Sequence, residues 1–425
     1  MATDKTPRRI SSAHLSPHFT EGIASLFRAM PKAELHVHLD GAVEVGTAAD
    51  LLSTGTVAGE AAPGAGAVAD LLSEAKAAGE AASDAETAAG VLSENIVLYE
   101  ALRRRMVIGG VLSSQEELLS YYELPVALLQ SEYALRRVTE EMILSKAADN
   151  VKYCEIRWAP GLHVRGGLSI EQVVKYVLSA GEDAARKTGM IVKFIVVGMR
   201  NESPETNIDM LRQAVAADAN SALAAVDLAG DERENPDPMR QAAFFAEARR
   251  HGLYVTFHCG ESLGGAGAHG GESLGGAGAH GGESLGGTGI LRRAVDELRP
   301  DRVAHGAIAA QDEELCRMLA ERGVQLDLCP TSNIQAGLYS EYKDFPLKIL
   351  WDRGVPVSVS TDSPVISGKT LSEEYFELAA SGQVTPYELW RINLNAIEHI
   401  FAPESIKQKL RDEFTAWAET AMPQT

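Results

Sequence analysis

The sequence predicts an α/β fold, a single (β/α)₈ barrel whose loops on the C-terminal face are expanded. The first observation is a set of eight short apolar, often β-branched runs, which lie near 33–39, 152–158, 191–198, 224–229, 254–258, 302–305, 324–329 and 355–361. The second is that stretches with helical spacing separate most of these runs. Strands that alternate with helices form parallel sheets, and eight such units close into a TIM barrel.

Helices are expected between and after the strands, at 170–188, 238–252, 312–323 and 372–381. The region from Pro386 to Met422 also has a helical pattern and should complete the outer layer of the barrel. Residues 1–29 are expected to be an N-terminal tail that leads into a helix, with the first 20 residues poorly ordered. Residues 30–425 should then form the barrel domain.

Two internal repeats interrupt the alternation of strands and helices. The first has a period of 20 residues and gives an expansion near 47–110, with aligned units at 49–53, 69–73, 89–93 and 109–113. These Ala/Gly-rich units are weakly patterned, so parts of them are expected to be loosely ordered.

The second repeat has a period of 11 residues and gives an expansion near 260–289. Residues 260–270 recur identically at 271–281, and a third copy starts at Gly282. So much glycine predicts a flexible loop, because glycine loses much conformational entropy on ordering. Both expansions follow predicted strands and should therefore lie on the active-site face of the barrel.

Composition narrows the class of ligand and the cellular compartment. The chain has 425 residues and a formal net charge of −20, which argues against nucleic acid or an anionic membrane as a partner. This negative charge is compatible with a small neutral or cationic ligand. The alternative is that the charge only keeps the protein soluble. The four cysteines are far apart and form no Cys-x-x-Cys pair, and no run approaches a membrane span. We therefore expect free thiols and a cytoplasmic protein; the sequence sets no oligomeric state.

Histidine and aspartate occur where predicted strands end. His36 and His38 are two residues apart in one strand, so both imidazoles point to the same face. His258, His305 and Asp362 each lie at the end of a later predicted strand. In a parallel barrel these ends converge on one site. Histidine and carboxylate side chains from separate strands are suitable ligands for a catalytic divalent metal ion.

Six motifs occur in a fixed order along the chain. They are His36-Val-His-Leu-Asp-Gly41, Asp227-Leu-Ala-Gly230-Asp-Glu, His258-Cys-Gly-Glu261, Ala304-His305-Gly, Leu328-Cys-Pro-Thr-Ser-Asn333 and Ser360-Thr-Asp362. With these motifs the chain resembles the adenosine deaminase family of the amidohydrolase superfamily, from about Met30 to about Ile400.

The resemblance implies one Zn²⁺ per chain, held by His36, His38, His258 and Asp362. The metal ion would lower the pKa of a bound water molecule toward neutrality, so that hydroxide attacks C6 of a purine nucleoside. Asp362 would also orient the hydroxide, and His305 would act as a base or electrostatic partner. The implied reaction converts adenosine or 2′-deoxyadenosine to inosine or its deoxy form, with release of ammonia.

The resemblance also implies residues that contact the substrate. Glu261 matches the proton donor to ring nitrogen N1. Gly230 matches a backbone contact to the purine, Asp40 matches a ribose contact, and His38 faces the substrate as well as the metal. A further set, Arg200, Trp158 and Asn333, is expected to support the site.

Ser363 departs from the pattern of the family. The family commonly has a second aspartate at this position, where the carboxylate meets purine N7. A serine hydroxyl still forms hydrogen bonds, but it lacks the charge and reach of a carboxylate. The substrate is therefore adenosine itself or another aminopurine, such as adenine or a modified adenosine. A third alternative is a metal-binding but inactive member, in which the two loop expansions block substrate entry or misplace Glu261.

The 11-residue repeat creates three copies of His-x-Gly-Glu, and they compete for one role. The later copies are His269/Glu272 and His280/Glu283, and the last of these has the family-like separation from His305. We nevertheless assign the site to His258 and Glu261, because only His258 follows an apolar strand and a metal ligand needs rigid support. A slipped register that uses His280 and Glu283 is the alternative.

Two other hydrolytic reactions fit the sequence less well. Ring-amide hydrolysis with two metal ions usually needs a carboxylated lysine after a middle strand, and no lysine occupies those predicted strand ends. Chemistry of the cytidine deaminase type is disfavoured, because the chain has no Pro-Cys-x-x-Cys motif.

Overall fold

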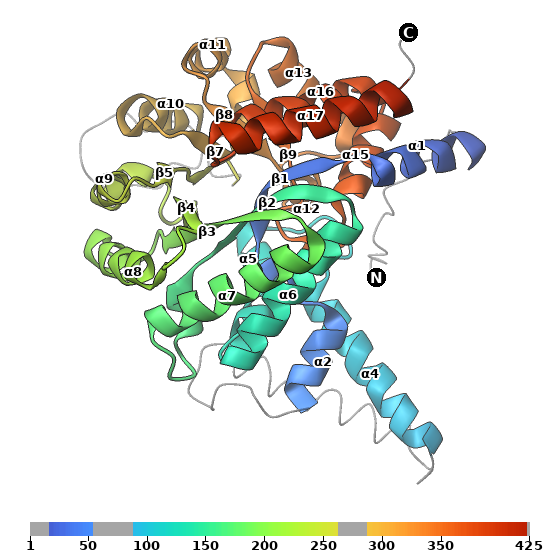
Figure 1. The fold of residues 1–425 in the computed structure, drawn as a ribbon, viewed down its shortest axis with the longest axis vertical. Helices are drawn as coiled ribbons and strands as arrows, with labels where there is room; N and C mark the ends of the chain where they lie inside the picture. Colours follow the sequence, from blue (N-terminus) through green and yellow to red (C-terminus); the bar gives the residue numbers. More distant parts are fainter. Residues whose placement is uncertain (1–16, 54–87, 262–286, 423–425) are drawn as a thin grey trace, which may run out of the picture.

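Short parallel strands form the centre of the molecule, and helices surround them (Figure 1). A computed structural model describes residues 17–53, 88–261 and 287–422. The strands are β1 (Lys32–His38), β2 (Val151–Trp158), β3 (Ile191–Met199), β4 (Leu223–Ala229), β5 (Tyr254–Val255), β6 (His258–Cys259), β7 (Arg302–His305), β8 (Gln325–Leu328) and β9 (Val357–Val359). Every strand expected from the sequence is confirmed, with small shifts at the ends.

The strands form two parallel sheets that meet at both of their edges. The order in one sheet is β1-β2-β3-β4-β5 and in the other β6-β7-β8-β9. β5 and β6 are two pieces of one expected strand, and between them Thr256 N donates to Val226 O at 3.0 Å. At the other edge, Asp362 forms a parallel bridge with Val37 of β1. This arrangement gives eight strand positions and confirms the (β/α)₈ barrel.

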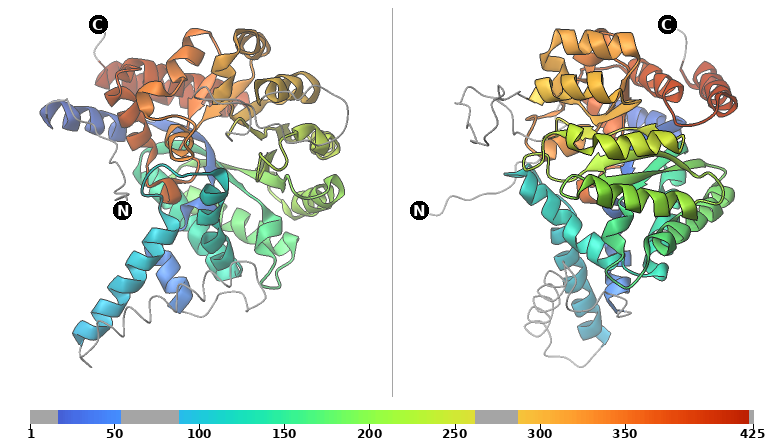
Figure 2. Two further views of the ribbon diagram at one scale, coloured as in Figure 1. Left: turned by 180° about the vertical axis from the view of Figure 1, so that it is seen from behind. Right: turned by 90° about the vertical axis from the view of Figure 1, so that its left-hand side faces the viewer.

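Helices cover the outside of the strands (Figures 1 and 2). They are α1 (Pro17–Ala29), α2 (Val45–Ser53), α4 (Ala88–Met106), α5 (Gln115–Leu128), α6 (Glu132–Ala148), α7 (Ile170–Thr188), α8 (Pro204–Ala217), α9 (Ala242–Arg250), α10 (Gly287–Leu298), α11 (Glu313–Arg322), α12 (Pro330–Gln335), α13 (Leu347–Asp352), α14 (Pro364–Ser367), α15 (Leu371–Ala380), α16 (Pro386–Glu398) and α17 (Glu404–Ala421). Among the described residues, no helix is both long and apolar enough to span a bilayer.

The expected helix 170–188 is α7, and its local sequence explains both ends. Ser169 and Gln172 form a capping box at the start, and Gly189 ends the helix with a φ of 74°. The expected helices 312–323 and 372–381 are α11 and α15. The expected helix 238–252 begins as a 3₁₀ turn before α9, and the region from Pro386 is divided into α16 and α17, with Pro403 preceding α17.

The first repeat contains more helix than the sequence indicated. Its units at 49–53 and 89–93 lie in α2 and α4, where weak order was expected. Alanine is a strong helix former, and α2 buries Ala48 and Leu51, which stabilises the helix by packing. Figure 2 shows α4 projecting from the barrel beside α2. Most of the second repeat, like residues 54–87, lies outside the described residues.

The N-terminal helix begins earlier than expected. α1 starts at Pro17, within the first 20 residues that were predicted to be a poorly ordered tail, and residues 1–16 lie outside the described residues. Lys32, just after α1, donates through Nζ to the carbonyl oxygens of Phe27 and Met30 at 2.8 and 2.9 Å. These bonds satisfy carbonyl groups at the end of α1 and fix the helix to the start of β1.

A network of buried charges fills the middle of the barrel. Arg302 donates from Nε to Asp327 at 3.0 Å and also pairs with Glu155. Arg157 donates from Nη1 to Asp227 at 2.9 Å. All five side chains are fully buried. Charges are stable in such surroundings only when they are paired and hydrogen-bonded, so the network demands a fixed arrangement of the strands.

Replacement of Arg302 by methionine tests the network. Arg302→Met should lower the free energy of unfolding by about 3–5 kcal/mol, because Glu155 and Asp327 would remain buried without their partner. Urea denaturation followed by circular dichroism measures this loss. Arg186→Met, which removes an exposed ion pair with Asp183, is the control and should change the midpoint little. Equal stability of the two variants would contradict the assignment.

Candidate metal and catalytic site

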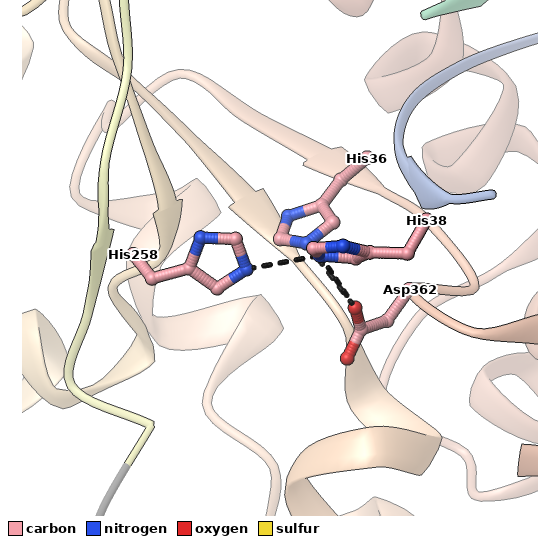
Figure 3. Close-up of side chains that lie close together, drawn as sticks. All are labelled: His36, His38, His258 and Asp362. Carbon is pink, nitrogen blue, oxygen red and sulfur yellow. Dashed lines mark hydrogen bonds and ion pairs between the residues drawn. The ribbon is translucent and has the colours of Figure 1, made fainter. Parts of the chain in front are cut away.

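Four side chains predicted as metal ligands come together at the C-terminal ends of the strands (Figure 3). His36 and His38 come from β1, His258 from β6, and Asp362 follows β9. The backbone brings Asp362 to β1, because Asp362 N donates to His36 O at 3.1 Å and His38 N donates to Asp362 O at 2.7 Å. Asp362 has a φ of 63°, a left-handed conformation that aspartate adopts more readily than most residues.

The nitrogen and oxygen atoms of these side chains face one another. One ligand atom from each of the four residues lies within 4.8 Å of the others, and all four residues are buried. Asp362 Oδ1 lies 3.2 Å from His36 Nε2 and 3.5 Å from His38 Nε2. His38 Nε2 lies 3.2 Å from His258 Nε2. Three imidazoles and one carboxylate at these separations can surround one divalent cation.

The hydrogen-bonding state of the cluster also fits a metal ion. Both ring nitrogens of His36 are buried: Nδ1 has no hydrogen-bond partner among the described residues, and Nε2 lies 3.2 Å from Asp362 Oδ1 without good hydrogen-bond geometry. A buried nitrogen without a hydrogen-bond partner destabilises the folded protein unless a ligand such as a metal ion binds it. Burial lowers the pKa of His36 well below its usual value and that of His38 to about 3, so both rings are neutral. Neutral imidazole is the form that binds a metal.

Asp227 orients His258 and was not singled out by the sequence as a residue of the site. Its carboxylate lies 3.0 Å from His258 Nδ1. The proton on Nδ1 is therefore held by Asp227, and Nε2 faces the cluster as an acceptor. The motif Asp227-Leu-Ala-Gly230 contained the signal, because side chains alternate along a strand and Asp227 faces the same side as Ala229, which lines the cavity.

His305 and Glu261 lie beside the cluster as a second pair. The ring of His305 is 4.8 Å from that of His36, centroid to centroid, and His305 Nε2 lies 3.7 Å from Glu261 Oε2. Asn333 Nδ2 is 3.2 Å from His305 Nδ1 and so fixes the ring, as the sequence suggested for Asn333. Burial, followed by the charge of Asp362, raises the pKa of Glu261 to about 8. Glu261 therefore holds a proton at neutral pH and can act as an acid.

The other two residues expected to support the site lie in different places. Arg200 donates to the backbone carbonyl of His258 and so contacts the site directly. Trp158 lies in the core, where its ring packs edge-on against Phe194 at 5.7 Å. The hydroxyl of Ser332 donates to Asp362 Oδ2 at 2.7 Å, a contact that the sequence did not indicate.

A cavity of about 110 Å³ opens beside the cluster. Its polar lining includes His38, Asp40, Glu261 and the backbone at Gly230, whose φ is 111°. Its apolar lining is Leu118, Leu119, Val126, Ala159, Leu162, Val197, Met199 and Ala229. This lining can accommodate a flat, largely uncharged ring whose polar atoms point toward the histidines.

Ser363 is the one predicted substrate-contacting residue that does not line the cavity. It is 3% exposed and lies behind Tyr122, whose side chain does line the cavity. No role for Tyr122 was predicted from the sequence.

The alternative register of the 11-residue repeat cannot be compared with this arrangement, since His280 and Glu283 lie outside the described residues. His258 and Glu261 both reach the site from β6 and the residues that follow it.

Known proteins resemble the chain in sequence and in fold. The family model described as adenosine deaminase matches residues 102–270 and 275–417. A protein named adenosine deaminase from Clostridium acetobutylicum is 30% identical over 298 residues, which are 70% of this chain and 81% of that protein.

Two solved structures share the fold. Adenine deaminase from Arthrobacter aurescens superposes with a TM-score of 0.72 at 22% identity, over 92% of this chain and 100% of that one. An amidohydrolase from Burkholderia ambifaria, crystallised with bound zinc, has a TM-score of 0.70 at 23% identity over 98% of each chain.

The sequence match covers both the strands that carry His258, His305 and Asp362 and the helices around them. The chain therefore belongs to the adenosine deaminase family, hydrolases of the amidohydrolase superfamily that act on C–N bonds.

Proposed function

We propose that this protein catalyses the zinc-dependent hydrolytic deamination of adenosine or 2′-deoxyadenosine, giving inosine or its deoxy form and ammonia. The observation that carries the proposal is the convergence of His36, His38, His258 and Asp362 beside a cavity that contains Glu261. A metal site, a proton donor and a pocket for a flat ring are the three parts that this reaction needs.

The proposed ligands of one Zn²⁺ are His36, His38, His258 and Asp362, which fit the ion in residue type and spacing. When bound, Zn²⁺ acts as a Lewis acid that lowers the pKa of a water molecule to about 7, so that hydroxide is available near neutral pH. Asp362 also accepts a hydrogen bond from Ser332, which fixes its carboxylate toward the cluster. We assign to Asp362 the orientation of the attacking oxygen toward C6.

Proton donation is assigned to Glu261, and electrostatic support of the attacking oxygen is assigned to His305. Glu261 holds a proton at neutral pH and lies at the edge of the cavity, where it can give that proton to ring nitrogen N1. Attack at C6 pushes electron density onto N1. Protonation of N1 neutralises the negative charge that would otherwise develop on this nitrogen. His305 is neutral, since burial lowers its pKa to about 3. Because Asn333 Nδ2 donates to its Nδ1, the ring carries its proton on Nε2 and can donate a hydrogen bond to the attacking oxygen as an electrostatic partner.

Asp40 and Gly230 are proposed to position the rest of the nucleoside. Both line the cavity, Asp40 from the turn that follows β1 and Gly230 from the end of β4. The positive φ of Gly230 exposes its backbone to the cavity in a conformation that other residues rarely adopt.

We place the barrel domain at residues 30–425. Because the four cysteines are free and buried, we also place the protein in the cytoplasm.

A second candidate substrate is another aminopurine, such as adenine or a modified adenosine. The observation that favours it is the enclosed Ser363, which leaves the cavity without a second carboxylate next to Asp362.

The proposed function is tested by ultraviolet-monitored deamination with zinc-loaded protein. Adenosine, 2′-deoxyadenosine, adenine and a 5′-substituted adenosine are compared, with ammonia measured separately. We expect turnover of adenosine or 2′-deoxyadenosine, lost together with bound zinc in Asp362→Ala. Asp352→Ala, at an exposed position, is the control and should retain both. Zinc binding without release of ammonia from any of the four compounds would refute the proposal.

Glu261→Gln should separate catalysis from metal binding. The amide cannot give its proton to N1, so kcat should fall by about 10²–10⁴-fold while the zinc content stays the same. Glu283→Gln is the matched control, because Glu283 occupies the equivalent position two repeats further along the chain. It should have little effect. Inactivity of Glu283→Gln together with an active Glu261→Gln would instead establish the alternative register.

Asp227→Asn should weaken zinc binding without removing a proposed ligand. The amide no longer holds the Nδ1 proton of His258 as a carboxylate does, so we expect the zinc dissociation constant to rise about 10- to 100-fold. Competition with a chelator measures this change. Activity should return at high zinc concentration, whereas a permanent loss would assign Asp227 a role other than the orientation of His258.

A further inference from the structure

Tyr122 places a phenol between Ser363 and the substrate cavity. It comes from α5, its ring lies 6.4 Å from that of His38, and its hydroxyl is hydrogen-bonded to Ser363 Oγ. Tyr122 lines the cavity, whereas Ser363 does not. On its other side Ser363 packs against Gly41, where an added Cβ would lie only 2.3 Å from the serine Oγ. The serine is therefore enclosed, and the phenol faces the ligand.

The two hydroxyl groups together leave one hydrogen-bond donor for a ligand. Each has one O–H, and one of the two is used within the pair. Since only Tyr122 reaches the cavity, the useful arrangement has Ser363 donating to the phenol oxygen and the phenol O–H directed inward. A phenol carries its proton at neutral pH, so Tyr122 remains a donor. The pair thus offers a neutral donor in place of a carboxylate.

The position of the phenol indicates which ring atom it meets. Glu261 lies beside His305, whereas Tyr122 lies beside His38. In an aminopurine, N1 adjoins C6 on one side, and the C5 edge that carries N7 adjoins it on the other. If Glu261 serves N1, the phenol beside His38 is on the side of N7. N7 of adenine carries no hydrogen and accepts a hydrogen bond.

We propose that Tyr122 determines substrate specificity by donating its phenolic O–H to N7 of the aminopurine, with Ser363 as the positioning residue behind it. The inference rests on the proposed deaminase function and deepens it. A neutral donor selects a ring with an unprotonated nitrogen at this position. Ser363 itself contacts no substrate, so Ser363→Asp alone does not restore a carboxylate contact, because Gly41 and Tyr122 enclose that position.

The experiment compares Tyr122→Phe with Tyr121→Phe, using ligands that differ by one ring atom. The ligands are 3-deazaadenosine, which keeps N7, and 7-deazaadenosine, which lacks it, and calorimetry on zinc-loaded protein gives the dissociation constants. Tyr122→Phe should weaken binding of 3-deazaadenosine about tenfold, the effect of one lost hydrogen bond. It should leave binding of 7-deazaadenosine unchanged. Tyr121, the neighbouring tyrosine that does not line the cavity, should affect neither ligand.

Three results would overturn the inference. Equal weakening of both ligands would show a structural role for Tyr122, no change in either would show no contact, and weakening of 7-deazaadenosine alone would place the contact elsewhere on the ring. Ammonia release by the unmodified protein is measured first. Failure of the proposed reaction would appear there, in the absence of any substitution, and the binding comparison would still decide the role of Tyr122.

Discussion

The buried contact between Arg157 and Asp227 is the interaction on which the site depends. Arg157 also donates to the carbonyl oxygen of Leu35, the residue before His36. Burial alone would raise the pKa of Asp227, but the charges of His258 and Arg157 hold it well below its usual range. Asp227 thus stays ionised and holds His258. The guanidinium of Arg157 therefore connects β2 with β4 and β1. Through these contacts it helps to position two proposed metal ligands, His258 and His36.

The barrel is divided along its axis by polarity. Arg302, Glu155 and Asp327 fill its middle with paired charges, whereas the cluster at the C-terminal ends holds three histidines and one aspartate. Paired charges below the site supply rigidity without a strong net field, because opposite charges lie within hydrogen-bonding distance of each other. The open wall of the cavity is largely apolar, so a ligand ring is taken out of water where the polar groups are fixed.

Sequence alone predicted the residues whose place follows from a strand. His36, His38, His258 and Asp362 were found because strand ends in a parallel barrel converge, and the structure brings them together. The contact between Tyr122 and Ser363 was not predictable, because it joins a helix to a turn far away in the sequence. The helices α2 and α4 were also missed, since small residues give little periodic signal and their packing partners are distant. His280 and Glu283 stay an alternative that only experiment decides.

The bridge between Val37 and Asp362 has a consequence for biosynthesis. It joins the first strand to the residue after the last one, so the full set of four side chains exists only when almost the entire chain has left the ribosome. Non-local contacts of this kind form slowly, because a long loop must close first. Nascent chains that stop before β9 lack the carboxylate, so the proposed metal site with all four side chains can form only late in synthesis.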